Sequence, residues 1–174
     1  MSFLRFRKLR VWLLLLAAAC PPLALADAVT DVQQLAHKGQ TALAIQMAQR
    51  HIADNPSHAQ MRFLLGVLQS ESGQQALAMQ TYQALTQEYP ELAEPYNNLA
   101  VLLAAQGELG KAREALEMAL RANPDYAVAH ENLGDVYSTM AAQSYQRSSQ
   151  LDALHSTAAP KLKVLQTLKP LRIE

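Results

Sequence analysis

One spacing recurs through the middle of this chain and limits what the chain can fold into. Gly39, Gly73 and Gly107 are 34 residues apart (73 − 39 and 107 − 73). The same interval separates the members of two other sets, Ala44, Ala78 and Ala112, and Pro56, Pro90 and Pro124. A constant interval of this length is typical of a chain built from stacked copies of one supersecondary unit.

The clearest copy of the unit runs from Ala93 to Pro124 and contains two helical patterns separated by Gly107. The apolar residues of both patterns recur at steps of three and four, as on one face of a helix; they are Tyr96, Leu99, Ala100 and Leu103, then Leu109, Ala112, Leu116, Ala119 and Leu120. A single hairpin cannot bury both apolar faces against itself, so each copy needs neighbours. The sequence therefore predicts an all-α array of helical hairpins.

The unit resembles the tetratricopeptide repeat, which places an aromatic residue, Leu-Gly, a tyrosine, an alanine, an aromatic residue, an alanine and a proline at set positions. In the central copy these positions hold Tyr96, Leu99-Ala100, Leu103, Ala112, Leu116, Ala119 and Pro124, and in the preceding copy Arg62, Leu65-Gly66, Gln69, Ala78, Tyr82, Leu85 and Pro90. A third copy opens with His130, Leu133-Gly134 and Tyr137, and the earliest keeps Gly39, Ala44 and Pro56. The resemblance implies a short right-handed α-α superhelix of about three helix pairs.

The spacing also divides the chain. We predict a leader at 1–26, a degenerate N-terminal helix pair at 27–58, and two full repeats at 59–92 and 93–126. A partial repeat follows at 127–155. The period places the next turn glycine at 107 + 34, where the chain has Ala141, so this segment is expected to form one long capping helix. A basic tail at 156–174 completes the chain, with a short helix expected over Lys161 to Leu168.

The leader has the three parts of a secretory signal peptide. A basic stretch from Arg5 to Arg10 precedes an apolar run, and Ala24-Leu25-Ala26 before Asp27 suits cleavage after Ala26. The apolar run is shorter than the approximately 20 residues that a membrane-spanning helix requires. The sequence therefore predicts a periplasmic protein with no membrane span after cleavage.

Cys20 leaves a second interpretation of the leader open. A lipoprotein would be cleaved before this cysteine and anchored through it, although Ala17 stands where the bacterial signature usually has leucine. A retained leader is the third possibility. Cleavage after Ala26 removes the only cysteine, so the mature chain would have no disulfide and no thiolate metal site.

The charge and the motifs exclude several classes of function. The chain has 15 basic and 15 acidic residues, and four of the basic ones lie in the leader, so the remainder carries 11 − 15 = −4. A nucleic-acid-binding domain would instead be basic. The stretch from Gly107 to Lys111 lacks the first glycine and the hydroxyl residue of a phosphate-binding loop, and His130-Glu131 lacks the second histidine of a zinc-protease helix. We therefore predict no catalytic residues, no cofactor and no metal, and hence no enzyme.

The resemblance implies that the first helix of each pair lines a concave face where partner peptides lie. The predicted lining is Phe63, Val67, Glu94, Asn97, Asn98, Val101, Glu131, Asn132 and Asp135. Asn98 and Asn132 stand where this family often binds a peptide backbone, and the alternative for them is a hydrogen bond to the neighbouring helix. The acidic lining favours an extended protein partner that is neutral or basic.

The predicted function is that of a non-enzymatic adaptor in the bacterial cell envelope. Two alternatives stay open at this point: a non-catalytic accessory subunit of an envelope enzyme or assembly complex, and a structural lipoprotein anchored through Cys20. The identity of the partner and the oligomeric state are not determined by these patterns.

Overall fold

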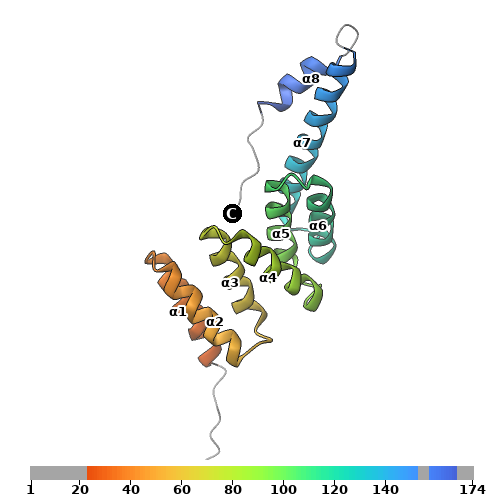
Figure 1. Cartoon of the computed structure of the whole chain (residues 1–174). Coiled ribbons are helices and arrows are strands. Elements are labelled where there is room, and N and C mark those ends of the chain that lie inside the picture. Colours follow the sequence, from red (N-terminus) through yellow and green to blue (C-terminus); the bar gives the residue numbers. More distant parts are fainter. Residues whose placement is uncertain (1–22, 153–156, 168–174) are drawn as a thin grey trace, which may run out of the picture.

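The computed structural model describes residues 23–152 and 157–167, and over these residues the chain forms eight helices and no strand (Figure 1). Their bounds are α1 Leu23–His37, α2 Thr41–Asp54, α3 Ala59–Glu71, α4 Gln75–Glu88, α5 Ala93–Ala105, α6 Leu109–Ala122, α7 Ala127–Leu151 and α8 Ala158–Leu165. Successive helices pack on one another, so the chain forms an elongated stack of hairpins. The predicted all-α superhelical array is confirmed.

Within each of the first three pairs the turn is closed by a glycine with a left-handed backbone. Gly39, Gly73 and Gly107 have φ angles of 73°, 78° and 78°, a conformation that side chains with a Cβ rarely adopt. The residue after each glycine donates its amide to the carbonyl five residues earlier, as Gln74 does to Gln69 at 2.8 Å. This arrangement satisfies the free carbonyls at the helix end and explains why glycine recurs at this position.

The junctions between pairs are also alike. Asn55, Tyr89 and Asn123 each donate an amide to the carbonyl four residues earlier, at 2.9, 2.8 and 2.9 Å, and a proline follows each of them. Proline has no amide to continue the helix. Three residues after each of these positions the chain closes a turn, as His58 does onto Asn55 at 3.1 Å. Each hairpin is therefore presented to the next in the same way.

The fourth unit has no internal turn. α7 is one helix of 25 residues, which confirms the predicted long helix as far as Leu151. The predicted end at His155 lies outside the described residues. α8 begins at Ala158, ahead of the predicted Lys161, and packs on α7.

The structure describes the chain from Leu23, four residues ahead of the predicted first helix at Asp27. The basic and apolar parts of the predicted leader and Cys20 lie outside the described residues.

The buried apolar side chains form two cores. The N-terminal core consists of Val29, Val32, Ala44, Ile45, Ala48, Met61 and Leu68, from α1, α2 and α3. The central core is built by α4, α5, α6 and α7 around Tyr82, Leu99, Leu116 and Val136. α3 contributes to both, because Met61 and Leu68 belong to the N-terminal core while Phe63 packs against the central core.

Candidate functional site

The side chains that α3 and α5 present to each other line two hollows, which we call the Tyr82 pocket and the Phe63 pocket. The Tyr82 pocket takes Val67, Ser70 and Glu71 from the C-terminal half of α3, and Asn98, Val101 and Leu102 from α5. The Phe63 pocket takes Ala59, Gln60 and Phe63 from the N-terminal half of α3, with Leu92, Glu94 and Pro95 at the start of α5. Since each pocket uses corresponding halves of both helices, the two follow one another along a single strip, the α3–α5 groove.

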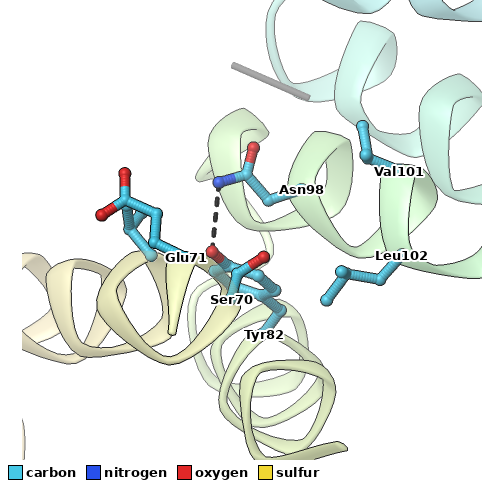
Figure 2. A pocket seen from close by; sticks show the side chains of 7 residues that line it. Ser70, Glu71, Tyr82, Asn98, Val101 and Leu102 are labelled. Carbon is cyan, nitrogen blue, oxygen red and sulfur yellow. Dashed lines mark hydrogen bonds between the residues drawn. The ribbon is translucent and has the colours of Figure 1, made fainter. Parts of the chain in front are cut away.

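The Tyr82 pocket is a cavity of about 100 Å³ whose floor is the Tyr82 ring from α4 (Figure 2). Tyr82 reaches this position because Gly66 of α3 has no side chain: a Cβ there would lie 2.6 Å from Cε1 of the ring. The amide of Asn98 donates to the Tyr82 hydroxyl at 3.2 Å, as the dashed line in Figure 2 shows. The pocket thus joins three helices.

The Tyr82 hydroxyl stays protonated at physiological pH. Burial raises the pKa of Tyr82 to about 12, the nearby Glu71 raises it further, and the hydrogen bond from Asn98 works in the opposite direction. A protonated phenol can both accept and donate. Since its oxygen accepts from Asn98, the hydroxyl is able to donate to, or accept from, a group that enters the pocket.

The Phe63 pocket is larger, about 380 Å³, and mainly apolar. Phe63 forms the wall towards the Tyr82 pocket, where its ring lies 5.9 Å from the Tyr82 ring between centroids. Glu94, in the first turn of α5, supplies the charged residue of the lining. An apolar hollow with a charged rim suits a side chain of a bound segment.

Asn97 and Asn132 do not line the open groove. Both are 4% exposed, and the amide of Asn132 donates to the side-chain carbonyl of Asn97 at 2.9 Å. The amide of Asn97 in turn donates to Asn98 at 3.2 Å, so a chain of hydrogen bonds runs from α7 through α5 to Tyr82 of α4. For Asn132 the structure favours the alternative that it satisfies a neighbouring helix, here through Asn97, because two buried amides need partners.

The repeat explains why the hydrogen bond between Asn132 of α7 and Asn97 of α5 has no counterpart between α5 and α3. Asn98 stands one period before Asn132, and Phe63 stands one period before Asn97 (132 − 98 and 97 − 63 are both 34). Asn132 bonds to Asn97, but a phenylalanine offers Asn98 no such partner, and Asn98 bonds to Tyr82 instead. The position that holds the amide of Asn97 in α5 thus holds an aromatic ring in α3, and Asn98 lines the Tyr82 pocket.

The remaining predicted lining residues separate into two groups. Phe63, Val67, Glu94, Asn98 and Val101 lie in the α3–α5 groove, although Val101 is only 5% exposed. Glu131 and Asp135 lie on α7; Glu131 is exposed and Asp135 is half-buried. Burial, and then the charge of Glu131, raise the pKa of the Asp135 carboxyl.

The groove is lined by the acidic residues Glu71 and Glu94 and by no basic residue, and Arg62 of α3 is already paired. The Arg62 guanidinium donates to Glu88 at 2.8 Å and lies over the Tyr89 ring at 5.8 Å, and the hydrogen bond with Glu88 is the main reason that the pKa of Arg62 is raised. α5 contains no lysine or arginine. Among the described residues, no ion pair occupies Glu71 or Glu94.

Sequence reasoning does not place Glu71, Leu102 or Tyr82 at this surface. As the aromatic residue of its repeat, Tyr82 is expected in the core, and it is indeed 1% exposed, but the edge of its ring and its hydroxyl also face the pocket. The signal that could have indicated this role is Gly66, because glycine is unfavourable in a helix interior and, at this position, permits the close approach of Tyr82.

Outside the α3–α5 groove, the described residues show few arrangements that would suit metal binding or catalysis. Over residues 23–152 and 157–167, no three His, Cys, Asp or Glu side chains gather as metal ligands would. His51 and His58 form a pair, with Nε2 of the first 2.8 Å from Nδ1 of the second. None of the helices that the structure describes is both long and apolar enough to cross a membrane.

Comparison with known proteins agrees with the fold. The family profile described as a tetratricopeptide repeat matches residues 32–93, and the one described as a TPR repeat matches residues 102–140. No curated protein matches the sequence.

Among solved structures, MamA is 21% identical with a TM-score of 0.60, and the match covers 77% of this chain and 81% of that protein. A thermophilic TPR protein of Thermus thermophilus is 24% identical with a TM-score of 0.61, covering 82% and 83%. The O-GlcNAc transferase of Thermobaculum terrenum is 21% identical with a TM-score of 0.60, but the match covers 72% of this chain and only 26% of the transferase. At these identities the likeness concerns the fold.

Proposed function

We propose that this chain, which belongs to the tetratricopeptide repeat family, is a non-enzymatic adaptor of the bacterial cell envelope that holds an extended segment of a partner protein in the α3–α5 groove. Tetratricopeptide repeats are protein-interaction scaffolds, and such arrays present extended concave surfaces to their partners. The observation that carries the proposal is the groove itself, where two neighbouring hollows lie open between α3 and α5.

The partner that this groove favours is neutral or basic. Glu71 and Glu94 line the groove and form no ion pair among the described residues, and Glu131 and Asp135 are further acidic residues on α7. Exposed ion pairs contribute only about 0 to 1 kcal/mol each. Binding is therefore expected to be modest in affinity, spread over several residues and sensitive to salt.

Photo-crosslinking from the groove tests the adaptor function. A photoreactive amino acid at Ser70, which lines the Tyr82 pocket, is compared with one at Gln80, an exposed residue of α4. In an envelope extract we expect a discrete adduct from the groove position that is absent from the control and is lost at high salt. Equal labelling from both positions would refute the groove as the binding site.

A double charge reversal tests the acidic surface on α7. Glu131→Lys with Asp135→Lys is expected to weaken capture of the same partner at low salt while the melting temperature stays near that of the parent, because Glu131 is exposed and Asp135 is half-buried. If capture is unchanged, the partner is confined to the α3–α5 groove or lies on another face.

The envelope location is proposed from the leader. Sequencing the N-terminus of the exported protein separates the alternatives: a mature start at Asp27 supports a periplasmic protein, an acylated Cys20 supports a lipoprotein, and an intact Met1 supports a retained leader. A chain that stays in the cytoplasm would refute the proposed location without touching the adaptor function.

An accessory subunit of an envelope enzyme or assembly complex is the second candidate. A related array occurs in the Thermobaculum O-GlcNAc transferase, where the match covers 26% of the chain, so this fold can accompany an enzyme. An enzymatic activity in the crosslinked adduct that is missing from the chain alone would favour this candidate over a simple adaptor.

A further inference from the structure

The polar atoms that line the Tyr82 pocket are nearly all oxygens. Ser70, Glu71 and Tyr82 each present oxygen. The amide of Asn98 is already engaged, because its nitrogen donates to the Tyr82 hydroxyl (Figure 2) and its oxygen accepts from Asn97. A primary ammonium group has three donors and no acceptor. The donors of such a group and the acceptors of this pocket are therefore complementary.

We propose that the Tyr82 pocket receives a lysine side chain of the partner segment, and that the Phe63 pocket receives an apolar side chain four positions away from that lysine. The inference rests on the proposed function, because it requires an extended segment in the α3–α5 groove. It adds which side chains are recognised and at what spacing.

The lining and the charge both favour lysine. Val67, Val101 and Leu102 give the apolar wall that a four-carbon stem needs, while the carboxylate of Glu71 supplies a negative charge that no described basic side chain neutralises. The cavity is small, at about 100 Å³. A compact ammonium suits this volume better than the broad, planar guanidinium of arginine.

The spacing follows from the geometry of the two helices. Phe63 and Glu71 are eight residues apart on α3, and Glu94 and Leu102 are eight residues apart on α5 (71 − 63 and 102 − 94). At about 1.5 Å per residue, the two residues of each pair, one from either pocket, are about 12 Å apart along their helix. An extended chain advances about 3.3 Å per residue and points alternate side chains to one face, so residues four apart are separated by about 13 Å on the same face.

A set of short peptides tests this inference on the full chain. Each is a fluorescent glycine, serine and threonine peptide of about ten residues that contains one leucine and one lysine at a spacing of two, three or four, in both orders. Binding is measured by fluorescence anisotropy at low salt. In further peptides acetyl-lysine or arginine replaces the lysine of the spacing-four sequence.

We expect the spacing-four peptide of one order to bind about fivefold more tightly than the others, and acetylation of its lysine to remove about the same factor. Glu71→Gln should weaken binding of the lysine peptide and leave the acetyl-lysine peptide unchanged. The matched control is Glu114→Gln, which removes an exposed carboxylate from α6 and should change neither.

The outcomes separate the two proposals. If all spacings and the acetylated peptide bind equally, and Val67→Arg in the groove still abolishes binding, the proposed recognition of lysine and its spacing is wrong. The groove would then still be the binding site. If arginine binds as tightly as lysine, the assignment of the pocket to lysine is wrong. If no peptide binds and Ser70 yields no crosslink, both the proposed recognition of lysine and the proposed groove are refuted.

Discussion

Replacing Gly66 by alanine gives the most direct test of how α3 and α4 are packed. Gly66→Ala would put a Cβ 2.6 Å from Cε1 of Tyr82 and 3.1 Å from Cδ1 and Cζ. Tyr82 is 1% exposed and its hydroxyl is bonded to Asn98, so the ring cannot swing aside without losing that bond or its packing. We expect the substitution to destabilise the chain although alanine is the better helix former.

The magnitude follows from two opposing terms. Glycine to alanine in a helix interior gains about 1 kcal/mol, and forcing an extra methyl group into a packed core costs about 1 to 3 kcal/mol. Gly134 provides the matched control: it also lies inside a helix, and a Cβ built there meets nothing within 4 Å. The free energy of unfolding of Gly134→Ala should therefore exceed that of the parent by about 1 kcal/mol. That of Gly66→Ala should be about 1 to 3 kcal/mol lower than that of Gly134→Ala.

Urea unfolding followed by circular dichroism measures both free energies of unfolding. Adding Tyr82→Leu to Gly66→Ala should recover part of the loss, so that the double-mutant cycle shows a coupling of about 1 kcal/mol or more. If Gly66→Ala gains stability as Gly134→Ala does, or if the cycle shows no coupling, the close approach of α4 to α3 is refuted, together with the account of why the Tyr82 pocket exists.

Three further outcomes follow from the structure. Leu116→Ala, at a side chain 1% exposed, should cost about 2 to 5 kcal/mol in urea unfolding, whereas Leu43→Ala, at 49% exposure, should cost far less; equal losses would contradict the assigned core. A glycine-containing turn inserted after Met140 should lower helicity and stability, and unchanged values of both would mean that α7 is already broken there. Burial and the charge of His51 lower the pKa of His58 below 6.5, so the unfolded chain takes up this proton more readily and stability should fall as the pH drops below about 6.5. Between neutral pH and about pH 5, the melting temperature of His58→Gln should fall less than that of the parent. An equal fall would show that the histidine pair does not contribute to the pH dependence of stability.

The architecture was predictable because local and periodic signals agreed. Gly73 and Pro90, for example, mark the turn and the end of one pair, and the observed helices begin or end within two residues of the predicted positions there. The absence of a glycine at 141 predicted the unbroken α7 for the same reason. The backbone conformation requires these residue types at these positions, so a short window of the sequence is enough to predict the turn or the helix end.

The site was only partly predictable, because it depends on which side chains meet across helices. Periodicity placed Asn97, Asn98 and Asn132 beside the buried stripe, but neighbouring residues on a helix differ by about 100° in direction, and only the approach of α7 buries Asn97. Glu71 and Tyr82 come from parts of the second repeat with no pattern of their own pointing to a partner. The role of Tyr82 arises from the tertiary contact that Gly66 makes possible.

Because α3 contributes to both cores, the stack can open in two separate parts. The N-terminal core can open while the central core keeps its own packing, so amide hydrogens of α2 should exchange faster than those of α5 and α6, as expected where stability is a sum of neighbouring interfaces. A segment bound along both α3 and α5 links the part of the stack around the N-terminal core to the part around the central core. Its binding free energy is then added to the free energy needed to open the N-terminal helix pair. Occupancy of the groove should thus slow exchange in α2, a helix that contributes no residue to either pocket.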